Sequence, residues 1–511
     1  MSSSVLPRAF VVLTLPVAFA AIGAACEDAA APSPERIAAA RFKVTSLTYL
    51  GSAADDQLRE ALPEADGSVW IAGQACGPGF PTTPGVLGTS YRGEDTSRKP
   101  VTGGYGGDCW IGRLGADGKR FVTASYFGGS RQERNVYGLE RAKDGDLVFT
   151  TMTRSPDMKT TPGSFQPRYG GGSADWYVAR VSPDLKSLRY ATFLGGSESD
   201  FPRAGLALDS ADRPVVVGYS GGDFPSATDA SLTAARGQDD VIVAQLSADG
   251  ARLVASARIG GRAGDEVAGV VLGPQGEVFY AGQTASPDFP ATATAPQPAL
   301  GGGFDAAIVR LAPDLSTVRA ASFLGGARDE FSEHRLLSTA TGDIYVTGST
   351  GSHDFPATKG AWRTAFGGVN DGFLVRYAPD LSRVVFATFV GGKGDDNLLM
   401  PTLGPDGSIW CVGFTSDSAF PTTPDALQPK FGGGKSDGIV VAISADGARL
   451  VYSSFFGGEG TDSLRSIAFL KDGSAWLVGT TSSKNLSATP GAPQPKLAGG
   501  TDGFILKIAP R

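Results

Sequence analysis

The chain has 511 residues, of which 71 are Gly and 33 are Pro, and only 19% of its residues are charged. So many turn-forming residues exclude a mainly helical protein, while 41% hydrophobic residues are enough to bury a large core. The formal net charge of -7 provides no attraction for phosphate backbones, so we expect no nucleic-acid partner.

The first residues have the pattern of an export signal. Arg8 precedes an apolar run over residues 9–19, and small residues continue from there to Cys26. The apolar stretch is short for a membrane span, and no later segment is apolar for long enough to be one. We therefore expect an exported protein whose signal peptide covers residues 1–25.

The end of this signal allows two kinds of processing. Residues 23–26, Gly-Ala-Ala-Cys, resemble a bacterial lipobox, in which the cysteine becomes the lipidated first residue. Gly23 stands where such boxes usually carry Leu or Val, and ordinary cleavage after Ala25 would suit the same residues. We expect lipidation of Cys26, which would hold the protein at the outer membrane or cell surface, with secretion as the alternative. Residues 26–40 have no core pattern and are predicted to be a tether.

A short motif, an aromatic or aliphatic residue followed by an apolar residue and two glycines, recurs along the rest of the chain. The first copy has Ser in place of its second glycine. The motif's first glycines are Gly51, Gly128, Gly195, Gly260, Gly325, Gly391 and Gly457. Their spacing gives seven units of about 66 residues over 41–511, which indicates a repeat architecture.

Each unit has the pattern of four short strands, which we call a, b, c and d. In the third unit they are predicted over 205–208, 214–219, 241–246 and 253–259. The a–b and c–d links are tight and often contain Asp-Gly, a signal for hairpin turns. Four antiparallel strands form one blade, which must be covered by neighbouring blades on both faces.

The two ends of the chain predict how the ring closes. The last unit stops after its c strand, over 502–508, and a spare d strand stands at 42–50 before the first a strand. Pairing these two segments completes the seventh blade. We therefore predict an all-β fold, a seven-bladed β-propeller with four antiparallel strands per blade and a last blade closed by the N-terminal strand.

The units resemble the bacterial SBBP family of seven-bladed β-propeller repeats. The sixth unit follows that pattern in order: Phe-Val-Gly-Gly at 389–392, Asp395-Asp396, Asp406-Gly407, Phe-Pro-Thr-Thr-Pro at 420–424 and Gly-Gly-Gly at 432–434. The resemblance covers residues 41–511. It implies an exported surface protein, and it implies little about activity, because members of the family are mostly without an assigned reaction.

The short turns place all long loops on one face of the ring. The b–c loops there carry a repeated Phe-Pro pair, and its ring could stack on sugars or peptides or could fill the cleft between blades. We favour packing, since recurrence at matching positions is what packing demands. The rings are Phe80, Phe224, Phe289, Phe355 and Phe420.

Carboxylates recur on the same face in two places. One precedes each c strand, where it can accept backbone N–H groups or bind calcium; these are Asp108, Asp175, Asp239, Asp305, Asp371, Asp437 and Asp502. Others form consecutive acidic pairs in the d–a loops, namely Asp55-Asp56, Asp265-Glu266, Asp329-Glu330 and Asp395-Asp396.

Three roles are open for the d–a pairs. They could be solvated or cap turns, the last three pairs could ligate calcium, or a pair could act as the acid and base of a glycosidase. Catalysis needs one unequal pair, whereas these copies are spread around the ring. We therefore assign no catalytic residue, favour the capping role, and consider calcium as the only cofactor.

The first unit carries the one strong departure from the repeat, an insertion over residues 88–107. Cys76 and Cys109 bracket it, and in an exported protein such a pair suggests a disulfide. The insertion is either tolerated decoration or a partner-binding loop. The residues we expect to contact a partner are Tyr91, Arg92, Arg98, Lys99 and Tyr105.

Together these patterns predict an exported, lipid-anchored and monomeric binding scaffold without enzymatic activity. Its partner would be an envelope or extracellular protein or a glycan, and only the lipid would contact the membrane. The alternatives are a carbohydrate-active lyase or hydrolase that uses carboxylates on the long-loop face, and a structural module stabilised by calcium.

Overall fold

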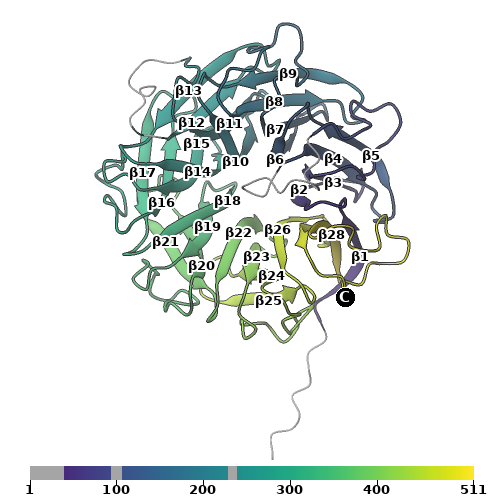
Figure 1. Cartoon of the computed structure of the whole chain (residues 1–511). Coiled ribbons are helices and arrows are strands. Elements are labelled where there is room, and N and C mark those ends of the chain that lie inside the picture. Colours follow the sequence, from purple (N-terminus) through teal and green to yellow (C-terminus); the bar gives the residue numbers. More distant parts are fainter. Residues whose placement is uncertain (1–39, 94–105, 228–236, 238) are drawn as a thin grey trace, which may run out of the picture. The chain divides into compact units, whose positions relative to one another are not determined.

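A computed structural model of the chain describes residues 40–93, 106–227, 237 and 239–511. These residues form 28 strands in seven four-stranded antiparallel sheets, arranged as blades around a central axis (Figure 1). Among them no helix is long and apolar enough to cross a membrane. The predicted signal peptide and tether, with Cys26, lie outside the described residues apart from Ala40. The predicted seven-bladed β-propeller is confirmed.

The first three complete blades follow one another along the chain. Blade 1 contains β2 (Gln57–Pro63), β3 (Val69–Ala75), β4 (Asp108–Leu114) and β5 (Phe121–Phe127). Blade 2 contains β6 (Glu133–Arg141), β7 (Leu147–Thr153), β8 (Asp175–Val181) and β9 (Leu188–Leu194). Blade 3 contains β10 (Asp200–Leu208), β11 (Pro214–Ser220), β12 (Asp240–Leu246) and β13 (Leu253–Ile259).

The other blades repeat the same order. Blade 4 contains β14 (Asp265–Leu272), β15 (Val278–Thr284), β16 (Asp305–Leu311) and β17 (Val318–Leu324). Blade 5 contains β18 (Glu330–Ser338), β19 (Ile344–Thr350), β20 (Asp371–Tyr377) and β21 (Val384–Val390). Blade 6 contains β22 (Asp396–Leu403), β23 (Ile409–Thr415), β24 (Asp437–Ile443) and β25 (Leu450–Phe456). Blade 7 contains β26 (Asp462–Phe469), β27 (Ala475–Thr481), β28 (Asp502–Pro510) and β1 (Phe42–Leu50).

The predicted closure of the ring is confirmed. Strand β1 pairs antiparallel with β28 in a register that sets Leu50 opposite Gly503 and Phe42 opposite Pro510. The order of the closing sheet is therefore β1-β28-β27-β26. Hydrogen bonds between the two ends of the chain complete blade 7, so this sheet has the same four strands as the other six.

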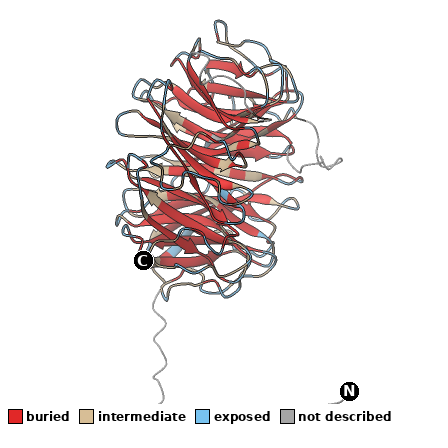
Figure 2. Ribbon diagram, turned by 90° about the vertical axis from the view of Figure 1, so that its left-hand side faces the viewer, coloured by how far each residue is buried: buried red, intermediate tan, exposed pale blue. Residues whose placement is uncertain are grey.

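The hydrophobic core lies between the blades. Each of the seven contacts between neighbouring blades holds one cluster of buried apolar side chains. The two middle strands of a blade are covered on both faces, and all seven residues of β3, for example, are buried. Figure 2 shows the sheets buried and the exposed residues mainly in the loops. A strand buried on both faces is a continuous apolar run in sequence, as in residues 214–217.

The repeated Phe-Pro rings belong to this core. Phe80, Phe224, Phe289, Phe355 and Phe420 are each at most 8% exposed. Phe224 packs on Trp176 with ring centroids 4.8 Å apart, and Phe355 lies 5.0 Å from Phe373. Packing between blades is therefore confirmed for these rings, which are too buried to stack on a ligand.

Candidate functional site

The short turns lie on one face of the ring and the long connections on the other, as the sequence predicted. A short a–b turn such as residues 64–68 closes with two backbone hydrogen bonds and has Gly67 at φ 85°, a conformation that suits glycine. The b–c connections are much longer, for example residues 416–436 between β23 and β24. The long connections and the starts of the inner strands share one face, which we call the long-loop face.

Seven pairs of buried carboxylates lie just beneath this face. One member opens the c strand of a blade, and the other stands at the start of the a strand of the next blade around the ring. Each of these side chains is at most 1% exposed. The pairs are Asp108 with Glu133, Asp175 with Asp200, Asp240 with Asp265, Asp305 with Glu330, Asp371 with Asp396, Asp437 with Asp462, and Asp502 with Asp56.

The hydrogen bonds of one pair show what these carboxylates do. Asp175 accepts the backbone N–H of Gly170 in the b–c loop, at 2.5 Å. Asp200 accepts the N–H of Gly196, the second glycine of the repeated motif, at 2.7 Å. Backbone N–H groups likewise donate to the other a-strand acids and to five of the other c-strand aspartates, so the predicted capping role is confirmed at most of these positions.

The pairs also explain the first glycine of the motif. A Cβ added at Gly195 would lie 2.7 Å from Asp200 Oδ2 and 2.8 Å from Asp175 Oδ1, which is closer than real Cβ contacts allow. The two carboxylates therefore stand beside this glycine, and the missing side chain makes room for them. Five other junctions have the same crowding at the equivalent glycine, and at Gly51 the nearest atoms to an added Cβ belong to Asp502.

Burial and mutual repulsion change the proton affinity of these groups. Burial, with a smaller contribution from the nearby Asp108, raises the pKa of Glu133 to about 8. Burial and the nearby Asp371 likewise raise the pKa of Asp396 to about 7. At four junctions the Oδ1 atom of the c-strand aspartate has no hydrogen-bond partner among the described residues. A protonated neighbour would supply the missing donor. The raised pKa values thus follow from the burial of the carboxylate pairs.

Two sequence expectations need correction here. The c strand of blade 3 begins at Asp240, and the expected Asp239 is only partly buried one residue before it. The consecutive acidic residues of the d–a loops do not act as pairs. Asp265, Glu330 and Asp396 face inward and are fully buried. Their neighbours lie further out, and Glu266, for example, forms an ion pair with Arg203.

The partners Glu133, Asp200 and Asp462 were missed by the sequence reasoning. A signal for them exists, because an acidic residue stands five positions after the first glycine of the motif in all seven units. Among the described residues no three His, Cys, Asp or Glu side chains form a group suited to a metal ion. Calcium bound by Asp265, Glu266, Asp329, Glu330, Asp395 and Asp396 stays a prediction.

The predicted partner-binding loop is described only in part, since Arg98, Lys99 and Tyr105 lie outside the described residues. Tyr91 packs edge-on against Tyr126 at 6.0 Å. Arg92 is exposed, its backbone N–H donates to Asp108, and its guanidinium forms an ion pair with Asp157 of the next unit at 3.0 Å. These contacts dock the start of the insertion across the junction between blades 1 and 2.

A cavity of about 170 Å³ opens beside this docked segment. Its wall is formed by Leu87 to Ser90 and Arg92 of the first unit, by Met158 and Lys159 of the second, and by Tyr126, Phe127, Gly128, Tyr177 and Leu188. Met158 stands where five other units have the Phe of Phe-Pro. A thioether chain is thinner than a phenyl ring, so Met158 leaves more room at this junction than a Phe would.

The expected disulfide between Cys76 and Cys109 is not formed in the structure. Cys109 lies opposite Gln74 in the β3–β4 ladder, and its Sγ faces blade 2, where it lies 3.0 Å from Thr151 Oγ1. The backbone N–H of Cys76 donates to Asp56, one of the buried carboxylates. Cys411 is fully buried in the core between blades 5 and 6, as expected of a small apolar side chain.

Comparison with known proteins finds similar folds and identifies no family for this chain. No protein-family model matches the chain, and no curated protein matches it in sequence. The SBBP resemblance therefore stays a prediction, while the class of protein, a seven-bladed β-propeller, is given by the structure itself.

Several solved structures are similar in fold. A protein of unknown function from Dyadobacter fermentans matches with 10% identity and a TM-score of 0.44, over 92% of this chain and 100% of its own. BamB from Moraxella catarrhalis matches with 10% identity and a TM-score of 0.37, over 91% and 99% of the two chains. A gluconolactonase from Xanthomonas campestris matches with 14% identity and a TM-score of 0.30, over 71% and 90%. Likenesses this distant transfer no function.

Proposed function

We propose that this protein is an exported binding scaffold of the bacterial envelope, anchored by lipid at Cys26, which uses its long-loop face to hold an envelope or extracellular protein or a glycan. The signal pattern of residues 1–26 supports export. The burial of all seven carboxylate pairs supports a role without catalysis, because an acid or base must reach its substrate.

The observation that carries this proposal is the cavity between blades 1 and 2. Six of the seven units carry no long insertion, and five have the Phe that fills the junction. The first junction has both a docked insertion and a cavity, with exposed Arg92 and Lys159 at its edge. A cavity of about 170 Å³ accommodates one side chain or one sugar ring, which is how a buried anchor of a partner is held.

The substitution Met158→Phe tests this proposal with little disturbance. It gives the second unit the residue that five other units have, so the ring should fill the cavity while the fold keeps its stability. A screen of glycans and envelope proteins against residues 41–511, which contain every strand of the ring, identifies ligands of the unmodified protein. M158F should weaken their binding at least about tenfold, as expected for loss of an anchor contact.

Lys159→Glu reverses a charge at the edge of the cavity and should weaken binding of an acidic partner. Lys359→Glu is the matched control, since Lys359 is exposed in the corresponding loop of the fifth unit. A ligand that binds M158F and K159E as tightly as the unmodified protein would place the binding site elsewhere. Deletion of residues 88–107 gives an independent test, because a ligand retained by that variant does not use the insertion.

A further inference from the structure

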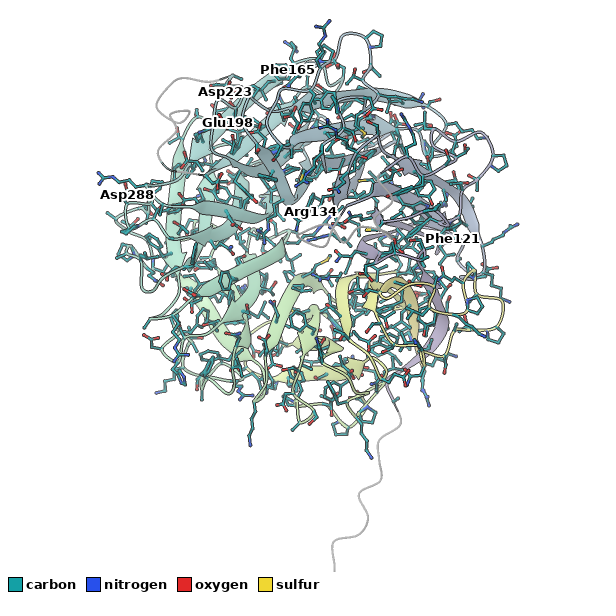
Figure 3. The ribbon with its side chains drawn as sticks, viewed as in Figure 1. Phe121, Arg134, Phe165, Glu198, Asp223 and Asp288 are labelled. Atoms are coloured by element: carbon teal, nitrogen blue, oxygen red, sulfur yellow. The ribbon has the colours of Figure 1, made fainter. Side chains whose placement is uncertain are left out.

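The inner strands of the blades offer a comparison of equivalent positions around the ring. Strands β2, β6, β10, β14, β18, β22 and β26 surround the central opening (Figure 1). The residue after the buried acid of an inner strand lies by this opening, as Figure 3 shows for Arg134 of β6. The next strand of the blade sets a second residue directly opposite it, for example Gln283 opposite Glu266. Both residues stand at the long-loop end of the blade.

In blades 3 and 4 these two positions are filled by side chains that contact each other. Phe201 and Tyr219 of blade 3 lie with their ring centroids 5.4 Å apart. In blade 4 the side chain of Gln283 donates a hydrogen bond to Glu266 at 3.1 Å. The protein's own side chains thus occupy the space at the inner, long-loop end of these blades.

Blade 7 has the small residues Ser463 and Thr480 at the same two positions, and a cavity of about 450 Å³ opens there. The cavity lies at the start of β26 and β2, so it is on the long-loop face at the inner side of blade 7. Its wall includes the ring of Phe414 from blade 6, Thr501 of blade 7, and Asp55 and Gln57 at the start of blade 1. Small side chains in one blade therefore leave a cavity between larger side chains of its two neighbours.

The polar groups of this wall are not used by the fold. The hydroxyl oxygen of Ser463 is buried and has no hydrogen-bond partner among the described residues. Within the same part of the chain, no hydrogen bond joins the side chains of Asp55, Gln57, Thr480 or Thr501 to another residue. A buried hydroxyl without a partner is unfavourable, and a molecule that supplies the partner is stabilised in return.

The equivalent residues of another junction show that such bonds can form. Between blades 5 and 6, Asn370 and Asp395 stand where Thr501 and Asp55 stand between blades 7 and 1. The Asn370 side chain donates a hydrogen bond to Asp395 at 2.9 Å. The carboxylate of Asp55 has no such donor within the described residues, so it is available to an entering molecule.

The charges at the cavity favour an uncharged ligand. Arg465 lines the wall together with Asp55 and Asp56, so charges of both signs are present. Asp56 already accepts the backbone N–H groups of Ser52 and Cys76, and Arg465 has interactions of its own. An ion of either sign would meet repulsion as well as attraction here. The hydroxyl groups of an uncharged molecule can bond to both kinds of side chain, because a hydroxyl both donates and accepts.

The ring of Phe414 gives the cavity an apolar surface beside these polar groups. Phe414 is only partly buried. A sugar ring matches this combination, since its C–H face can pack on an aromatic ring while its hydroxyls bond to carboxylate, amide and hydroxyl side chains. A cavity of about 450 Å³ is within the range of small-molecule sites and has room for roughly one or two sugar rings.

We propose that this cavity binds an uncharged sugar ring, either a free sugar or one unit of a glycan chain. Phe414 is the surface on which the sugar packs, and its hydrogen-bond partners are Asp55, Gln57, Ser463, Thr480 and Thr501. The site is separate from the cavity between blades 1 and 2, so it does not depend on the scaffold function proposed above.

Saturation-transfer NMR and titration calorimetry on the purified full-length chain test this proposal. The probes are glucose, mannose, galactose and N-acetylglucosamine, each as the single sugar and as a linear tetrasaccharide. At least one of them should bind, with a dissociation constant of about 1 mM or tighter. Tighter binding of a tetrasaccharide than of its single sugar would identify a glycan chain as the ligand, and equal binding would identify the free sugar.

Two variants of the aromatic wall locate the bound sugar. Phe414→Ser removes the ring, and blade 5 has Ser349 at the equivalent position, so the repeat accepts serine there. F414S should weaken binding at least about tenfold, as expected for loss of an aromatic anchor. Phe331→Ser is the matched control, because Phe331 is 36% exposed on an inner strand and does not line the cavity. F331S should keep the affinity of the unmodified protein.

Two further variants test the polar wall. Ser463→Phe introduces the residue that blades 3 and 5 have at this position, Phe201 and Phe331, so its ring should fill the cavity and abolish binding. Asp55→Asn keeps the shape of the side chain but removes its charge, and it should weaken binding about tenfold, the loss expected for a charged hydrogen bond. Melting temperatures of all variants show whether the fold is kept.

Two results would overturn the proposal. One is the absence of binding by every one of these sugars at about 20 mM, a concentration at which even weak binding is detected. The other is a sugar that F414S and S463F bind as tightly as F331S does, since only the first two variants change the cavity.

Discussion

The substitution Asp396→Asn removes one ionisable group from one buried carboxylate pair. Burial, followed by the nearby Asp371, raises the pKa of Asp396 from 3.8 to about 7. A raised folded-state pKa means that ionisation opposes folding. The stability contributed by the protonated group is complete below pH 3.8 and is lost as the pH rises to about 7. A shift of this size corresponds to about 4 kcal/mol between the two ends of that window.

The asparagine variant does not titrate, so its stability relative to the unmodified protein should increase by up to that amount between pH 4 and pH 7. The introduced amide would not reproduce every hydrogen bond, because Asp396 accepts from both the Gly392 N–H and the Thr415 hydroxyl. That loss costs about 1 kcal/mol at every pH and leaves the slope unchanged. For a domain of this size 4 kcal/mol amounts to about 4 °C in melting temperature.

The assay is a series of thermal and urea unfolding curves of both proteins from pH 4.5 to pH 8.5. Turn aspartates such as Asp472, whose pKa is lowered by hydrogen bonds from Ser474, change stability in the opposite direction. They are common to both proteins and cancel in the difference. Asp395→Asn is the matched control, since Asp395 is adjacent but only partly buried and lies outside the pair. A difference between D396N and the unmodified protein that stays constant with pH would refute the reasoning.

Three further predictions follow from the same geometry. Gly195→Ala should lower the free energy of unfolding by about 2 kcal/mol or more, because its Cβ would meet Asp175 and Asp200. Gly264→Ala is the control, since the added Cβ would have open space around it, and this variant should unfold in urea nearly as the unmodified protein does. A reductant should not alter the melting temperature, since Cys76 and Cys109 form no disulfide in the structure. A decrease of several degrees would show instead that the two cysteines are bonded in solution. A chelator should likewise leave the melting temperature unchanged because the buried acids already cap backbone N–H groups; a decrease that added calcium reverses would support the calcium site.

The sequence predicted the architecture because its evidence is local and repeated. Seven copies of one motif fix the number of blades, and Asp-Gly turns such as Asp406-Gly407 fix the antiparallel order within each blade. The predicted N-terminal strand over 42–50 coincides with β1, and β28 begins at the predicted Asp502. Buried strands and tight turns are properties of a few neighbouring residues, which is why pattern alone located them.

The partners across blade junctions were not predicted, because they are separated in sequence and meet only in the closed ring. Adjacent acids such as Asp395 and Asp396 suggested a pair, yet alternation along the chain directs only Asp396 inward, where it meets Asp371 of the preceding blade. Cys76 and Cys109 form no disulfide in the structure for a related reason, since nearness in sequence does not set the direction in which a thiol points.

Sequence by itself thus determined the number of blades, the strands and the closure of the ring, because those follow from short-range pattern and from the count of strands at the two ends. Tertiary structure decided which side chains meet between blades. It buried the carboxylates as pairs at the junctions between blades and left a cavity beside Met158. Such meetings depend on the curvature and packing of the whole ring, which no single unit encodes.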